Sequence, residues 1–206
     1  MIEIREMHPS DIDRVAELDR SEHVTLAYTF RKGRLESENV DWAVPNWSTE
    51  GESAHSLWAR VVDWGALLEQ GGTMFGALDG DRLVGVAIYR PQLTATTAQL
   101  AVLHVSKGYR RKGIATRLTA EVIRLARQDG ARDVYVSATP SQSAVGFYQS
   151  QGFQLVDEPH PALYALEPED IHMIMQLPGS WKDPKGADRR SGGKPSGSDG
   201  GFGVDT

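Results

Sequence analysis

The spacing of hydrophobic and polar residues divides the chain into short strands and helices. Near the N-terminus, Ile2 and Ile4 alternate with charged residues, which predicts an opening strand. A helix is expected next, with Ser10 as its N-cap, Asp13 at its third position and its end near residues 19–21. The chain is therefore expected to open with a strand followed by a helix.

A hairpin and a longer helix are predicted in the next segment. Residues 24–30 and 35–44 have strand-like patterns and are expected to pair across a turn at Lys32-Gly33. An apolar stripe predicts a helix over residues 53–69, and the glycine pair that follows is typical of a helix end.

The second half of the chain has the more regular pattern. A nearly continuous apolar run at residues 98–105 indicates a strand in the buried middle of a sheet. A helix is predicted over residues 113–128. Its expected inner face consists of Ile114, Leu118, Val122 and Leu125. The remaining predicted elements are strands at residues 73–78, 82–89, 133–138, 153–156 and 171–177, and a short helix at residues 141–150.

This order of elements predicts an α/β (α+β) fold, in which a mixed sheet carries helices on both faces. From residue 179 onward, Gly, Ser, Pro, Lys and Asp predominate. Such a segment has too little apolar surface to offset the entropy lost on folding. We therefore expect one domain over residues 1–178 and a disordered tail over residues 179–206.

Composition narrows the classes of protein that fit. A net charge of −6 argues against nucleic acid as the main partner. The sequence has no cysteine, which excludes disulfides and a thiol nucleophile. No apolar run is long enough to cross a membrane, and the charged N-terminus does not resemble a signal peptide, so we expect a cytoplasmic protein. His160 and His172 lack metal-ligand spacing, so no metal is expected.

A basic turn between the strand at 98–105 and the following helix carries candidate chemistry. Arg110, Arg111 and Lys112 stand just before the helix, where the first backbone N–H groups have no acceptor within the helix. Gly113 and Ala115 allow an anion to approach the backbone closely. A diphosphate fits this arrangement, although a solvated basic turn is the simpler alternative. Neither a Walker motif nor a dinucleotide-binding glycine pattern is present.

A second segment makes the turn more specific. Residues 139–153 read Thr-Pro-Ser-Gln-Ser-Ala-Val-Gly-Phe-Tyr-Gln-Ser-Gln-Gly-Phe. Together, Arg-x-x-Gly-x-Ala at residues 110–115 and Ala-x-x-Phe-Tyr-x-x-x-Gly-Phe at residues 144–153 resemble the GCN5-related N-acetyltransferase (GNAT) superfamily. The motifs cover residues 98–153, and the order of elements fits from residue 2 to 177. The resemblance implies a mostly antiparallel sheet and acetyl-CoA as the acetyl donor.

The resemblance also implies a role for each matched residue. The backbones of Leu103 and Val105 are expected to pair with the pantetheine arm, and Ser141 stands where many members have an asparagine that touches this arm or the acyl group. Tyr148 matches the tyrosine beside the sulfur, where a phenol can protonate the departing thiolate as a general acid. The residues expected to hold the diphosphate are Arg110, Arg111, Lys112, Gly113, Ile114, Ala115 and Thr116.

The resemblance does not identify the general base. Some members use a glutamate where this chain has Gln99, which cannot accept a proton. Asp19, Glu22 and His23 are alternative bases, as is water, and surface solvation is the simpler explanation for each of the three side chains. His104 is expected to face the other side of the sheet as a packed histidine.

The acceptor site is less defined by the sequence. Trp42, Trp47, Trp58 and Trp64 are candidates either for an amine pocket or for packing of a helix onto the sheet. We expect an N-acetyltransferase that acts on a primary amine, with a small molecule favoured over a protein, and a homodimer is left open. The alternatives are a non-catalytic acyl-CoA-binding or sensing module and a transferase of longer acyl groups.

Overall fold

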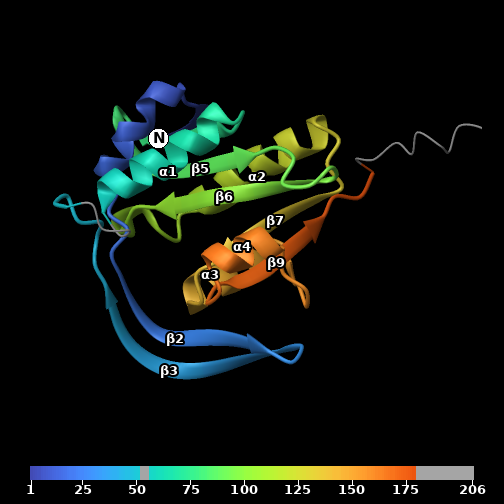
Figure 1. Cartoon of the computed structure of the whole chain (residues 1–206). Helices are drawn as coiled ribbons and strands as arrows, with labels where there is room; N and C mark the ends of the chain where they lie inside the picture. The colour runs from blue at the N-terminus through green and yellow to red at the C-terminus, as the bar shows by residue number, and fades with distance from the viewer. Residues whose placement is uncertain (52–55, 180–206) are drawn as a thin grey trace, which may run out of the picture.

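A seven-stranded mixed sheet forms the centre of the computed structural model, which describes residues 1–51 and 56–179 (Figure 1). The strand order is β1-β4-β5-β6-β7-β9-β8. The bounds are β1 (Ile2–Glu6), β4 (Thr73–Asp79), β5 (Arg82–Arg90), β6 (Thr97–Val105), β7 (Asp133–Ala138), β8 (Gln154–Leu155) and β9 (Ile171–Gln176). All neighbouring strands are antiparallel except the parallel pair β6 and β7. The predicted mixed, mostly antiparallel sheet is confirmed.

Two further strands, β2 (Glu22–Arg31) and β3 (Arg34–Val44), form a separate hairpin. Its turn lies at Lys32 and Gly33, where the sequence predicted a turn, and both residues have positive φ. The hairpin is long and curved, and it passes below α3 (Gln142–Ser150) in Figure 1. It joins the main body where the Tyr28 N–H donates to the Pro140 carbonyl over 2.9 Å.

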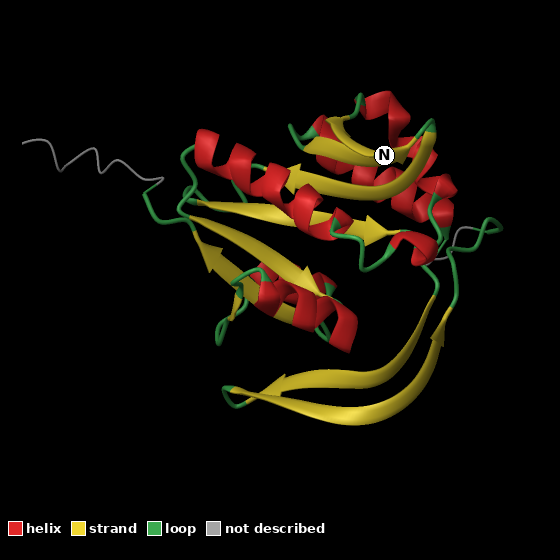
Figure 2. Ribbon diagram, turned by 180° about the vertical axis from the view of Figure 1, so that it is seen from behind, coloured by secondary structure: helices red, strands yellow, loops and turns green. Residues whose placement is uncertain are grey.

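Helices cover both faces of the sheet, as expected. One face carries the 3₁₀ helix η1 (Pro9–Glu17) and α1 (Leu57–Glu69), and the opposite face carries α2 (Ile114–Gln128), which lies in front in the rear view (Figure 2). Two hydrophobic clusters fill the two interfaces. The other short helices are η2 (Lys107–Tyr109) and α4 (Pro161–Leu166).

The first helix differs from the prediction in its cap and its type. His8, not Ser10, is the N-cap, because its ring accepts a hydrogen bond from the Ser10 N–H while the Asp11 carboxylate accepts one from the His8 N–H. Pro9 has a φ that suits the first helical position, so the helix begins earlier than expected. It is a 3₁₀ helix that ends at Glu17.

The later helices follow the predicted positions closely. Ser56 caps α1, and the predicted start at Ser53 lies outside the described residues. On α2, Ile114, Leu118 and Val122 are fully buried, but Ala126 replaces Leu125 as the last fully buried position. The helix α4 was not predicted. The expected tail lies, after its first residue, outside the described part of the chain. Within residues 1–51 and 56–179, every helix is too short or too polar to cross a membrane.

Candidate functional site

The strands β6 and β7 pair for only part of their length. Their register runs from Thr97–Asp133 to Gln99–Tyr135, after which β6 pairs with β5 alone. The pairing of β5 with β6 shifts in register between Ile88 and Tyr89, and such a β-bulge bends the strand. The carboxyl halves of β6 and β7 therefore separate within the sheet, as Figure 1 shows.

A cavity of about 770 Å³ opens between the separated strand ends. Leu103 and Val105 of β6 form one wall, and Thr139 and Ser141 after β7 form another. Every residue that the sequence predicted for the coenzyme site lines this cavity except Lys112. The structure therefore brings together two motifs that are some thirty residues apart in the sequence.

The N-terminus of α2 is built to present backbone N–H groups to this cavity. Gly113 is the N-cap in a left-handed conformation with φ of 76°, and Arg111 also has positive φ. No side chain in the described part of the chain caps the helix, so its first amides remain available to an anion. A Cβ at Gly113 would meet no described atom within 4 Å. The space beside the amides is therefore open to a ligand.

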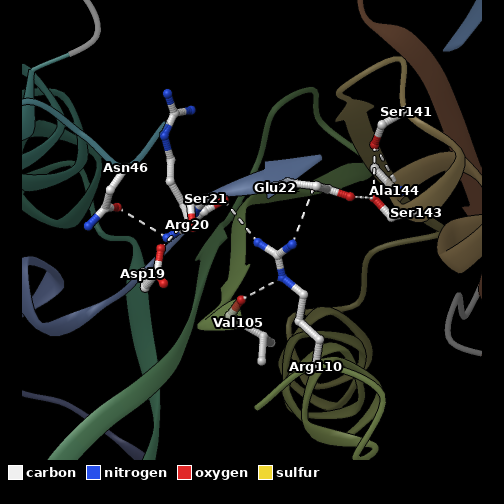
Figure 3. A network of polar contacts seen from close by, with 10 residues as sticks. All are labelled: Asp19, Arg20, Ser21, Glu22, Asn46, Val105, Arg110, Ser141, Ser143 and Ala144. Atoms are coloured by element: carbon white, nitrogen blue, oxygen red, sulfur yellow. Dashed lines mark hydrogen bonds and ion pairs between the residues drawn. The ribbon is translucent and has the colours of Figure 1, made fainter. Parts of the chain in front are cut away.

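Arg110 has its donors engaged by the protein itself, as Figure 3 shows. Its Nε donates to the Val105 carbonyl over 3.1 Å, and its Nη2 donates to the Arg20 carbonyl over 2.9 Å. Its Nη1 lies 3.5 Å from the Glu22 carboxylate. These contacts favour a positioning role for Arg110, which ties the start of β2 to the turn before α2.

Lys112 is the one predicted ligand that turns away from the cavity. Its Nζ donates to the Gly108 carbonyl over 3.0 Å and lies 4.9 Å from the centre of the Tyr109 ring. Lys112 can still contribute to the positive potential of the turn. A direct contact with the diphosphate needs a different rotamer of its side chain.

The helix α3 supplies the opposite wall. Ser141 is its N-cap, and the Ser141 Oγ accepts a hydrogen bond from the Ala144 N–H over 3.3 Å. The same Oγ lies 3.0 Å from the Oγ of Ser143. Ser141 is 3% exposed. Its capping of α3 is a structural role that the family resemblance did not assign to it.

Tyr148 is buried at the cavity, with 6% of its surface exposed. Burial raises the pKa of its phenol, and the nearby Asp170 carboxylate raises that pKa further. The hydroxyl therefore keeps its proton at neutral pH. A protonated phenol is the form that a general acid requires.

The three alternative bases have different surroundings. Glu22 and His23 line the cavity, whereas Asp19 does not. The Asp19 carboxylate accepts a hydrogen bond from the Ser21 N–H, and its hydrogen bonds to Ser21 lower its pKa, which makes it a poorer base. The His23 Nε2 lies 2.5 Å from Asp41 Oδ1 on the neighbouring strand.

Glu22 and Gln99 are both held by neighbouring side chains. The Glu22 carboxylate contacts Arg110 and accepts a hydrogen bond from the Ser143 Oγ. Gln99 is buried away from the cavity lining and accepts a hydrogen bond from Arg90 Nη1 over 3.3 Å. Neither side chain has the free carboxylate that a general base needs.

The four tryptophans between residues 42 and 64 divide into a buried pair and an exposed pair. Trp47 and Trp64 pack edge to face, with ring centroids 5.5 Å apart, and both rings contact His104 on the face of the sheet that carries α1. Burial lowers the pKa of His104 to about 4, so this histidine is neutral and packed, as predicted. Trp42 and Trp58 are exposed. None of the four lines the large cavity.

Comparison with known proteins agrees with this geometry. The sequence matches the family described as Acetyltransferase (GNAT) family over residues 35–153, which is more than half of the chain. The chain belongs to the GNAT acetyltransferase family. The match includes both motifs and the hairpin strand β3 after its first residue.

Individual relatives are similar over part of their length. The chain is 34% identical over 120 residues to N-acetyltransferase 8 of Mus musculus, covering 55% of this chain and 53% of that protein. It is 32% identical over 83 residues to N-alpha-acetyltransferase 30 of Schizosaccharomyces pombe, covering 38% of this chain and 55% of that protein. The chain thus spans about half the length of these curated relatives.

A solved structure supports the fold. The crystal structure of nourseothricin acetyltransferase matches with a TM-score of 0.64 at 19% identity, covering 86% of this chain and 99% of that one. The predicted GNAT-like fold is confirmed.

Proposed function

We propose that this GNAT-family domain, residues 1–178, transfers an acetyl group from acetyl-CoA to a primary amine. The observation that carries the proposal is the cavity between the diverging β6 and β7. It joins a helix N-terminus that no described side chain caps to a buried, protonated tyrosine. A diphosphate at the amides of residues 113–116 leaves the coenzyme arm to run along β6 toward Tyr148.

The reaction follows from the groups at this cavity. The nitrogen lone pair of a neutral amine attacks the thioester carbonyl carbon, and the carbon–sulfur bond breaks with its electrons on sulfur. The Tyr148 hydroxyl donates its proton to that sulfur, and the proton that nitrogen loses as the amide forms returns through solvent to the Tyr148 oxygen. A backbone N–H near Leu103 stabilises the oxyanion that forms on the carbonyl oxygen. No covalent intermediate with the protein is needed.

We also propose that the acceptor is a small molecule and that the protein is cytoplasmic. The similar proteins do not decide between a small-molecule and a protein acceptor, because one is an N-alpha-acetyltransferase and another is a nourseothricin acetyltransferase. A second cavity, described below, is of a size that suits a small acceptor.

The buried Gln99 favours a second candidate function. A chain without a base at this position is also consistent with a non-catalytic module that binds or senses acyl-CoA. A panel of primary amines with acetyl-CoA, read by release of free thiol, separates the two. Turnover with at least one amine is expected, and tight acetyl-CoA binding without any thiol release contradicts the transferase. Longer acyl-CoA thioesters in the same assay test the acyl preference.

A further inference from the structure

A second cavity, of about 510 Å³, lies between the tip of the β2–β3 hairpin and the segment that leads from α4 into β9. Thr29 and Phe30 line it from β2, and Tyr164 lines it from α4. The hairpin therefore borders both cavities, since residues 22–24 at the other end of β2 line the first one. Between the two, β2 is fixed to the loop before α3 by the bond from Tyr28 to Pro140.

The charges at the second cavity are mainly negative. Asp157, Glu169 and Asp170 contribute carboxylates to its wall, and Lys32 contributes one ammonium group. A wall with this excess of carboxylates attracts a cation. The exposed ring of Tyr164 beside them can pack against the carbon chain or the charge of an organic cation.

A buried histidine in the same wall has an unused polar atom. His172 is 4% exposed, and its Nδ1 has no hydrogen-bond partner among the described residues. Its ring packs near Tyr135 and Tyr164, with centroids 5.9 Å and 5.8 Å away, and its Nε2 lies 3.3 Å from the Glu167 carbonyl. Buried polar atoms are nearly always satisfied, so this nitrogen points to a polar ligand in the cavity.

Asp170 connects the second cavity to the proposed chemistry. It lines the second cavity, and its charge raises the pKa of Tyr148, which lines the first cavity. It immediately precedes β9, whose first residue pairs with the last residue of β7. Asp170 thus lies where β9 begins, next to the end of β7, and its charge acts on the proposed acid.

We infer that the second cavity receives a small cationic amine and that Asp170 takes the proton which this amine must lose before it attacks. The inference rests on the proposed acetyl transfer and supplies the base that Gln99 cannot be. One proton moves from the ammonium nitrogen to the Asp170 carboxylate and then to solvent. The freed lone pair forms the carbon–nitrogen bond, and the second proton lost by nitrogen balances the one that Tyr148 gives to sulfur.

The electrostatics of Asp170 suit this task. Burial raises its pKa to about 7, and the nearby Glu167 carboxylate adds to the effect. A base with a pKa near the working pH is effective in both accepting and releasing protons. The other charged or titratable groups that line the cavity are Lys32 from the hairpin turn, Asp157 after β8, Tyr164 of α4, Glu169 and His172 of β9. Tyr148 of α3 lines the first cavity and interacts with the charge of Asp170.

The test compares the wild-type chain with Asp170→Asn, and with Glu158→Gln as a control. Glu158 is exposed, and it adjoins Asp157 in sequence without lining the cavity. Thiol release from acetyl-CoA is measured between pH 5.5 and 9 with 1,5-diaminopentane and with 1-aminopentane. Calorimetry measures acetyl-CoA affinity, and also the binding of each amine to the protein loaded with coenzyme A. Asp170→Ser is a second variant in case the first does not fold.

We expect Asp170→Asn to lower kcat at pH 7 by about 100-fold, within the usual range for removal of a general base. In this variant the rise in kcat that wild type shows near pH 7 should disappear, while acetyl-CoA affinity should stay within about threefold of wild type. Wild type should bind the diamine more tightly than the monoamine. Wild-type kcat and pH profile in both Asp170 variants overturn the inference but leave the proposed function intact. Equal amine binding by wild type and variants overturns the cavity assignment, with or without turnover. Absence of thiol release from wild type with any amine overturns the proposed function instead.

Discussion

The Oγ of Ser143 donates a hydrogen bond of 2.5 Å to Oε1 of Glu22, across 121 positions of the sequence. The other Glu22 oxygen lies 3.5 Å from Arg110 Nη1 (Figure 3). Glu22 thereby connects two walls of the large cavity, namely the turn before α2 and the first turn of α3. Because both of its oxygens are engaged, it acts as a positioning residue for the coenzyme site.

Glu22→Gln tests this role. The amide keeps an acceptor for Ser143 but loses the ion pair with Arg110, so we expect acetyl-CoA to bind roughly three- to tenfold more weakly, as suits a half-buried pair worth about 1 kcal/mol. Calorimetry measures the affinity. Glu38→Gln, at an exposed position of β3, is the control and should bind acetyl-CoA as wild type does. Loss of a titration in the kcat profile, with unchanged affinity, would instead make Glu22 a base.

Gly113→Glu tests the anion site. The substitution places a carboxylate in the open space beside the α2 amides and forces an L-residue to adopt φ of 76°. We expect acetyl-CoA affinity to fall about 100-fold, which corresponds to about 2.7 kcal/mol. Gly108→Glu adds the same charge in the same turn, at a residue outside the cavity lining, and should weaken binding far less. Equal effects of the two substitutions contradict the assignment.

The sequence predicted elements whose signals are local. The apolar run of β6, the basic turn and the amphipathic α2 are adjacent in the chain, so periodicity and composition were enough to locate them. The short helix α4 was missed because six residues give too little periodicity. His8 was missed as a cap because Ser10 is the more usual residue type for that position.

Features that depend on distant contacts were not predictable in the same way. The engagement of Arg110 depends on Glu22 and the Arg20 carbonyl, some ninety positions away. Asp170 follows Glu169 in a polar stretch that resembles an ordinary loop, and only burial beside the hairpin distinguishes the two carboxylates. Lys112 lies within the family motif, yet the motif does not specify the rotamer that brings its side chain over the Tyr109 ring.

Tyr148→Phe tests the general acid. The phenyl ring preserves packing against Phe147 and Phe153, whose centroids lie 5.3 Å and 5.4 Å from that of Tyr148, but it has no proton to donate. We expect kcat to fall roughly 100-fold while acetyl-CoA affinity stays within about threefold. Because burial raises the pKa of Tyr148, the wild-type rate should not decline between pH 7 and 9 through loss of this proton.

The matched control for that variant is Tyr89→Phe. Tyr89 is also buried, but its hydroxyl donates to Asp129 over 2.7 Å and lies outside the cavity lining. Its loss should lower stability by about 1 kcal/mol and leave kcat unchanged. Thiol-release kinetics of the two variants under the same conditions compare the roles. Wild-type kcat in Tyr148→Phe removes this tyrosine from the mechanism.

His104 makes the stability of the fold depend on pH. Burial between Trp47 and Trp64, together with the charges of Arg20 and Arg110, lowers its pKa from 6.5 to about 4. Between those values the unfolded chain binds the proton and the folded chain does not, so falling pH favours unfolding. The stabilisation is complete above pH 6.5 and is lost as the pH falls toward 4.

His104→Phe should remove that dependence while keeping an aromatic ring between the tryptophans. A tenfold change in proton affinity is worth about 1.4 kcal/mol, so wild type should lose roughly 2–3 kcal/mol relative to the variant between pH 7 and pH 4.5. Urea denaturation at both pH values measures the difference in free energy of unfolding. Carboxylates titrate in both proteins, so only the difference between wild type and variant reports on His104. If the difference does not change with pH, the folded site accommodates a charged imidazole. The positive charges of Arg20, Arg60 and Arg110, which lower the pKa of His104, argue against that outcome.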